Sequence, residues 1–257
     1  MNMRIALAQV LPVWANPAEN LVRVDRYAAD AADAGAALVI FPEQVLFGWD
    51  PSSTAGAEDL AGNLVRALAR CARDHRIGLV GSIRERVEGG TRNTVVAFDA
   101  MGRTVAVYAK RHLFSSALED RVYLPGDTPA VFDCEGFLFG LAICYDLRFP
   151  ADFAGYRAMG ADGVLVTAAW PEERLHHWSL FLRARALDNR LYVAGVSYAR
   201  GRTPIGAYAG ASGVADPDGE FCALAGTEES LLLADLDRQR IESARQGPDP
   251  ARWTPEG

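Results

Sequence analysis

The sequence is poor in cysteine, and its cysteines form no recognisable motif. Cys71, Cys134, Cys144 and Cys222 include no CxxC pair and no short-range zinc-type cluster with the four histidines. Structural zinc sites depend on closely spaced ligands, so we expect no metal site. Disulfides are equally unexpected in a chain of 257 residues, because they mainly stabilise small secreted domains. Each cysteine therefore needs its own explanation.

Long apolar runs, clustered basic residues and phosphate-binding motifs are also missing. No stretch reaches the roughly 20 apolar residues of a membrane-spanning helix. Acidic residues outnumber basic ones by 33 to 26, and the net charge of −7 argues against nucleic-acid binding. The absence of GxGxxG and GxxxxGKS/T motifs predicts no nucleotide cofactor, and we expect no cofactor of any kind. The N-terminal MNMRIALAQV alternates like a strand and lacks a cleavage site, which predicts a cytoplasmic protein with no membrane partner.

Apolar residues are abundant, at 50% of the chain, and they occur in alternating strand-like and helix-like segments. Asn16 suits a helix N-cap and Pro17 the first helical position. The patterns predict strands at 3–10, 36–42, 76–83, 137–144, 161–170 and 190–199, helices at 16–35, 56–75, 150–160 and 172–189, and hairpins at 93–110 and 212–224.

The second half of the chain repeats the first. DHRIGLVGS in the first half is echoed by DNRLYVAGV in the second, and each half ends in a hairpin. Two such halves, stacked sheet against sheet with helices outside, predict an α/β fold that is a four-layer αββα sandwich. No linker separates them, so we expect a single domain over residues 1–257. The tail from about residue 238 lacks sustained periodicity and is predicted to wrap over the body or over a partner subunit, or to be a partly ordered terminus.

Three polar residues end apolar segments. Glu43 follows LVIFP, Lys110 follows TVAVYA, and Cys144 follows LFGLAI. Taken singly, Glu43 is typical of a solvated acid, Lys110 of a surface lysine and Cys144 of a small buried residue. Together they supply a base, a cation for a developing oxyanion and a thiol nucleophile, which indicates acyl transfer through a thioester followed by hydrolysis. The backbone N–H of Tyr145 would be a second donor to the oxyanion.

Three segments that contain these residues resemble the signature segments of the nitrilase, or carbon–nitrogen hydrolase, superfamily. They are FPEQVLFGW, YAKRHLF and CYDLRFP, in this order, and the resemblance covers nearly the whole chain. It implies the αββα sandwich and a triad of Glu43 as base, Lys110 as oxyanion stabiliser and Cys144 as nucleophile. It also implies a supporting glutamate before a PGD-like turn, a place that Glu119 takes here; the alternative is a solvated loop carboxylate.

CYDLRFP resembles the short amidases, and the segment 168–195 resembles the omega-amidase branch. The resemblance implies a hydrolase that releases ammonia and a carboxylic acid from a small linear amide, 2-oxoglutaramate or a related dicarboxylic monoamide. Asp188-Asn189-Arg190 and the segment 198–210 depart from that branch's pattern. The alternatives are an N-carbamoyl-amide hydrolase, a nitrilase, or a non-catalytic binding protein on the same fold. The resemblance also implies a homodimer.

Four further residues are candidates for contact with the substrate. Arg148 would bind a carboxylate, although pairing with Asp146 or another structural ion pair is an alternative. Trp170 and Phe47 would line the pocket, against the alternative that they belong to the core. His112 is a rival base for the thiol, but we interpret it as a hydrogen-bonding residue near the site.

Overall fold

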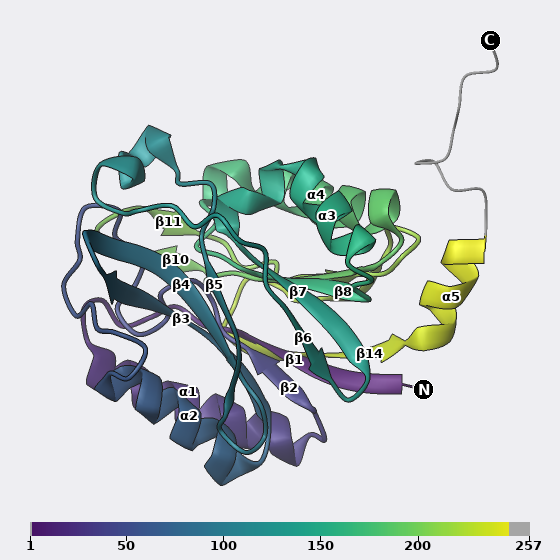
Figure 1. Ribbon diagram of the computed structural model, residues 1–257, viewed down its shortest axis with the longest axis horizontal. Coiled ribbons are helices and arrows are strands. Elements are labelled where there is room, and N and C mark those ends of the chain that lie inside the picture. Colours follow the sequence, from purple (N-terminus) through teal and green to yellow (C-terminus); the bar gives the residue numbers. More distant parts are fainter. Residues whose placement is uncertain (1, 247–257) are drawn as a thin grey trace.

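Two six-stranded sheets lie face to face, and a pair of helices covers the outer face of each sheet (Figure 1). The structure is a computed structural model that describes residues 2–246. Its layers confirm the predicted αββα sandwich, and each half of the chain supplies most of one sheet and its two covering helices.

The first sheet has the strand order β14-β1-β2-β3-β4-β5. β1, β2 and β3 are parallel, and the other neighbours are antiparallel. The bounds are β1 Asn2–Gln9, β2 Leu38–Ile40, β3 Gly78–Val87, β4 Gly90–Phe98, β5 Thr104–Ala109 and β14 Ser230–Asp237.

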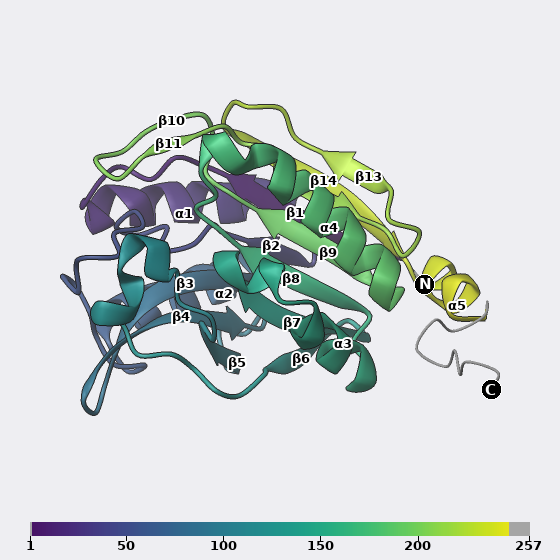
Figure 2. The same ribbon diagram turned by 90° about the horizontal axis from the view of Figure 1, so that it is seen from above.

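The second sheet has the corresponding order β13-β12-β9-β8-β7-β6, with β7, β8 and β9 parallel. A separate two-stranded ribbon, β10 and β11, lies at one end of the molecule (Figure 2). The bounds are β6 Val131–Cys134, β7 Phe137–Ile143, β8 Gly163–Thr167, β9 Tyr192–Val196, β10 Gly201–Arg202, β11 Ala207–Tyr208, β12 Gly213–Ala215 and β13 Phe221–Leu224.

The helices are α1 Pro17–Asp33, α2 Asn63–His75, α3 Pro150–Ala158, α4 Leu175–Asn189 and α5 Arg238–Gln246. The predicted cap of α1 is confirmed, because the Asn16 side chain accepts a hydrogen bond from the Glu19 N–H. α2 begins later than the predicted residue 56. The carboxylate of Glu58 accepts from the N–H groups of Leu64 and Val65 at 2.6 and 2.8 Å, and so supplies the cap from a loop.

Alternating residues of the strands divide the core into three layers. In β1, Ile5 and Leu7 face the second sheet, whereas Ala6 and Ala8 face α1 and α2. The third layer lies between the second sheet and α3 and α4, and Trp178 of α4 is fully buried there. Because both faces of the central strands are covered, their sequences read as continuous apolar runs.

The C-terminal part of the chain differs from the prediction. β14 was not predicted, and it pairs with β1 along its whole length. Residues 238–246 form α5, which packs on the body of the molecule, one of the predicted alternatives: Ile241 is only 1% exposed, and Arg238 and Arg245 pair with Asp162. The remainder of the predicted tail, 247–257, lies outside the described residues. Within 2–246, no helix has the length and apolar character needed to cross a membrane.

Candidate active site

The three residues predicted to do chemistry lie at the carboxyl ends of three strands. Glu43 follows β2, Lys110 directly follows β5, and Cys144 directly follows β7. The Lys110 ammonium nitrogen lies 2.9 Å from Oε1 of Glu43. Lys110 and Cys144 line the same pocket. The tertiary structure thus brings together three residues that are up to 101 positions apart in the sequence (144 − 43).

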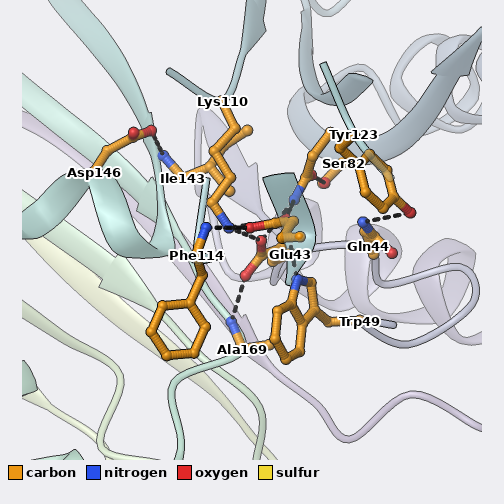
Figure 3. A network of polar contacts seen from close by, with 12 residues as sticks. Glu43, Gln44, Trp49, Ser82, Lys110, Phe114, Tyr123, Ile143, Asp146 and Ala169 are labelled. Carbon is orange, nitrogen blue, oxygen red and sulfur yellow. Dashed lines mark hydrogen bonds and ion pairs between the residues drawn. The ribbon is translucent and has the colours of Figure 1, made fainter. Parts of the chain in front are cut away.

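Lys110 is held by two carboxylates. Its Nζ lies 2.9 Å from Oε2 and 3.2 Å from Oε1 of Glu119. It also contacts Glu43, and Figure 3 shows Lys110 and Glu43 pointing toward each other. All three side chains are at most 1% exposed. The burial of Glu119 excludes the alternative of a solvated loop carboxylate. A buried cation between two fixed anions cannot rotate away, so its ammonium group is preorganised.

A glycine turn fixes the backbone beside Lys110. The N–H of Gly126, in the PGD turn, donates to the carbonyl of Lys110 at 2.8 Å. A Cβ on Gly126 would lie 2.3 Å from the carbonyl oxygen of Ala109, a distance that no side chain tolerates. The turn therefore requires glycine.

Asn93 was missed by the sequence analysis. From β4, its Nδ2 donates to Glu43 at 2.7 Å and to Glu119 at 3.2 Å, so it bridges the two carboxylates. The other oxygen of Glu43 accepts from the N–H of Ala169 at 3.1 Å. Trp49 donates to Glu119 from its ring nitrogen at 3.3 Å. Asn93 lies in the polar first half of β4, between Arg92 and Thr94, so no local pattern indicated it.

Burial and charge set the protonation states of the cluster. Burial raises the pKa of Cys144 well above its ordinary value, and Glu43 raises it further, while Lys110 opposes both. Burial also raises the pKa of Glu43, which makes it a stronger base than a solvated glutamate. Burial opposes the charge of Lys110, but the two carboxylates raise its pKa well above the usual range. The resting site is therefore a neutral thiol beside an ammonium group and a carboxylate base.

Cys144 stands on a strained turn. Its φ of +47° lies in the left-handed region, at the step from β7 into a 3₁₀ turn over Cys144–Arg148. Asp146 fixes this turn by accepting from the N–H of Ile143 at 2.9 Å, the N–H of His112 at 2.9 Å and the hydroxyl of Tyr108 at 2.8 Å. Asp146 was expected only as a partner for Arg148, but its oxygens are occupied by these donors.

The pocket over Cys144 encloses about 170 Å³, a size suited to a short linear molecule. Tyr145, Arg148 and Trp170 line it, as predicted from the sequence, and so do residues that the sequence did not indicate. The latter include Phe114, Ala117 and Arg174, whereas Ile205 and Tyr208 belong to the segment 198–210, which departs from the omega-amidase pattern. Phe114 and Tyr208 come from loops and a short ribbon, where no sequence periodicity marks a pocket position.

Two predicted contact residues lie elsewhere. The ring of His112 pairs with Oδ2 of Asp152 at 2.8 Å and stacks on Phe149, so the expectation that it contacts substrate is not supported. Phe47 packs into the core layer under α1 and α2, where Arg84 covers its ring. Neither residue lines the pocket, since His112 turns toward the start of α3 and Phe47 toward the first sheet's helices.

Arg148 is placed in the pocket by aromatic rings. Its guanidinium lies 5.2 Å from the ring centre of Trp170, 5.1 Å from that of Phe181 and 5.8 Å from that of Tyr145. Its polar partner is Nδ1 of His177, at 3.1 Å. Among residues 2–246, the structure pairs no carboxylate with Arg148, so the predicted alternatives of a structural ion pair are not supported.

A thiol on a strained turn, beside a buried lysine and its carboxylates in an αββα sandwich, defines a thiol-dependent hydrolase. Comparison with known proteins supports the assignment to a thiol-dependent hydrolase. The carbon–nitrogen hydrolase family matches residues 4–246, and the chain belongs to this family. It is a carbon–nitrogen hydrolase that acts on amides, as the sequence resemblance predicted.

Similar proteins carry amidase names. The chain is 33% identical to the human omega-amidase NIT2 over 95% of its own length and 92% of the relative's. It is 29% identical to the 2-oxoglutaramate amidase of Bacillus subtilis, over 96% and 95% of the two chains. The solved amidase of Nesterenkonia superposes with a TM-score of 0.86 at 31% identity, over 94% and 95% of the chains. A cysteine-to-alanine variant of that amidase was solved with butyramide.

Proposed function

We propose that this amidase hydrolyses the terminal amide of a short linear acid whose other end is a carboxylate, with 2-oxoglutaramate as the type of substrate. The two named relatives, an omega-amidase and a 2-oxoglutaramate amidase, support this class. The observation that carries it is Arg148, a cation without a carboxylate partner among residues 2–246, in the pocket that contains Cys144. A substrate carboxylate would complete its pairing.

The proposed reaction begins with the attack of the Cys144 sulfur on the amide carbonyl carbon while Glu43 takes the thiol proton. The carbonyl oxygen becomes an oxyanion held by the ammonium of Lys110 and the N–H of Tyr145. Collapse of this intermediate breaks the C–N bond, and Glu43 returns the proton to the leaving nitrogen, which departs as ammonia. Each oxyanion donor is worth about 10²–10³ in kcat at comparable sites.

The thioester is then hydrolysed by water. Glu43 removes a proton from the water as its oxygen attacks the thioester carbonyl, and the same donors hold the second oxyanion. Collapse breaks the C–S bond, releases the carboxylic acid and returns the proton to the sulfur of Cys144. Glu119 takes no proton in this scheme. It positions Lys110, because the Lys110–Glu119 contact is as short as the Lys110–Glu43 contact, at 2.9 Å.

Two amides of equal chain length test the substrate class. Succinamate and butyramide both have four carbons, and only succinamate carries a carboxylate. We expect higher kcat/KM for succinamate, measured by ammonia release. Arg148→Gln is expected to raise KM for succinamate about 10–100-fold, since a hydrogen-bonded charge contributes about 1.5–3 kcal/mol, and to change butyramide hydrolysis less than about threefold.

Arg103→Gln is the matched control, because Arg103 is exposed and pairs with Asp99 away from the pocket. An equal loss on both substrates in Arg148→Gln would assign Arg148 a purely structural role and contradict the proposed class. Release of carbon dioxide with ammonia from N-carbamoyl acids, or faster turnover of nitriles, would replace it with one of the two alternative reactions.

We also propose that the enzyme is a homodimer. The outward face of α4 exposes large apolar side chains, with Leu180 60% and Leu187 54% exposed, and these suit a second copy of the chain. Light scattering during gel filtration measures the mass. A monomer at micromolar concentration would contradict the proposal.

A further inference from the structure

A second cluster of reactive side chains lies on the opposite side of the first sheet from the pocket. α1 and α2 run side by side over the outer face of that sheet (Figure 1). Asp25 projects from α1, and Cys71 and His75 project from α2. Residues four apart on a helix lie one turn above each other on the same face, so Cys71 and His75 both face α1.

The three side chains converge on one point. One ligand atom from each residue lies within 4.8 Å of the other two. Nε2 of His75 is 2.8 Å from Oδ1 of Asp25. The thiol of Cys71 is buried at the base of the cluster, while Asp25 and His75 reach solvent, with side chains 61% and 24% exposed. A surface depression beside the cluster, lined by Asp25, Cys71 and Asp74, gives an ion access.

We propose that Asp25, Cys71 and His75 form a site for Zn²⁺ or a similar borderline-soft divalent ion, with water as the fourth ligand. Thiolate, imidazole and carboxylate are the ligands that zinc takes in proteins, at about 2.0–2.3 Å from the metal. Tetrahedral bonds of these lengths place ligand atoms about 3.3–3.8 Å apart. The present spacings, 2.8 Å between His75 and Asp25 and at most 4.8 Å for the others, would adjust to these values on binding. A single carboxylate and a thiol do not suit calcium or magnesium.

The proposed metal site is separate from the catalytic pocket, and a bound ion would stabilise the folded protein. None of its three residues lines the pocket that contains Cys144. A bound ion would join α1 to α2, because the ligands are up to 50 residues apart in the sequence. The sequence predicted no metal site, since the motif sought was a CxxC pair or a histidine cluster. The Cys71–His75 spacing is present in the sequence, but Asp25 is added only by the packing of the helices.

The ion must compete with a proton on Cys71. Asp74 and Arg70, which also line the depression, bring opposite charges near the site.

The test is a Co²⁺ titration of protein freed of any affinity tag. Tetrahedral cobalt bound to a thiolate gives a sulfur-to-metal charge-transfer band, and Zn²⁺ abolishes it by displacement. We expect this band in wild type and in Cys144→Ala, which removes the thiol of the candidate active site. We expect Cys71→Ser to lose it and the control Cys222→Ser to keep it. Saturating Zn²⁺ should raise the Tm of wild type by about 5 °C or more, and leave that of Cys71→Ser unchanged.

The outcomes separate the proposal from its alternatives. A band that survives in Cys71→Ser, a band lost only in Cys144→Ala, or no band at millimolar Co²⁺ overturns it. In the last case the cluster is an ion pair between Asp25 and His75 above a buried thiol. Amide hydrolysis by Cys71→Ser within twofold of wild type shows that the variant is folded. If that variant does not fold, His75→Gln, whose ring is partly exposed, carries the same test.

Discussion

Replacing Glu119 with glutamine tests how the buried lysine is held. The carboxylate of Glu119 accepts from Lys110 through both oxygens and from Trp49, Asn93 and the N–H of Phe114. All of these partners are donors. A glutamine keeps one acceptor oxygen, but its NH₂ group faces donors whichever way it turns.

The expected loss of unfolding free energy in Glu119→Gln follows from those contacts. If the NH₂ group takes the position of Oε2, the bonds from Lys110 at 2.9 Å and from Phe114 at 2.8 Å are both lost. Each buried donor left unpaired costs about 1–3 kcal/mol, and breaking a buried ion pair costs about 3–5 kcal/mol. We expect Glu119→Gln to lose about 3–5 kcal/mol of unfolding free energy, or at least about 6 °C in Tm. The misplaced ammonium should lower kcat about 10²-fold or more.

The stability loss should depend on pH. Burial alone would raise the pKa of Glu119, but Lys110 and the Phe114 N–H lower it below the ordinary value. A carboxylate with a lowered folded pKa stabilises the fold above its unfolded pKa, and the stabilisation is lost as pH falls through the folded pKa. The Tm difference between wild type and Glu119→Gln is therefore largest at neutral pH and shrinks below about pH 4.5.

Thermal unfolding followed by circular dichroism gives Tm, and ammonia release from succinamate gives kcat and KM. Glu172→Gln is the matched control, because Glu172 is exposed and does not line the pocket. Glu119→Asp keeps the charge and should recover part of the stability. If Glu119→Gln stays within 2 °C and threefold in kcat of wild type, the proposed positioning of Lys110 by Glu119 is refuted.

Three further predictions follow from the site. Cys144→Ala should abolish ammonia release while circular dichroism and Tm stay near wild type, and residual turnover above background would contradict the thioester route. Glu43→Gln should lower kcat, because the base is lost. The pH dependence of iodoacetamide labelling of Cys144 should nevertheless shift to lower pH, since Glu43 raises the pKa of the thiol, and a shift to higher pH would contradict this. Burial raises the pKa of Asp146 to about 6, and the hydrogen bond from the Tyr108 hydroxyl opposes that rise. Tyr108→Phe removes this bond, so the acid limb of the profile of kcat against pH should move to higher pH. An acid limb that does not move would show that Asp146 does not control it.

Periodicity predicted most of the fold because each central strand is covered on both faces. Continuous apolar runs such as LVIF and GVLVT leave no polar face, and a chain with such runs must place helices on one side and a second sheet on the other. The edges were harder to predict. β14 and α5 are exposed on one face, so their residues mix polar and apolar types, and their place depends on β1 and Asp162.

The sequence by itself was enough to predict the layers of the fold and the residues Glu43, Lys110 and Cys144. The periodicity of apolar residues and the order of the motifs can be read along the chain without knowledge of the packing. Only the tertiary structure decided which other groups meet them. Asn93 bridges the carboxylates and Asp146 fixes the turn through contacts with residues far away in the chain, and no local pattern records such contacts. His112 obeyed strand alternation in the prediction, but the backbone after β5 leaves the sheet and its ring turns to Asp152. Side-chain direction beyond a strand depends on packing, which a one-dimensional pattern does not contain.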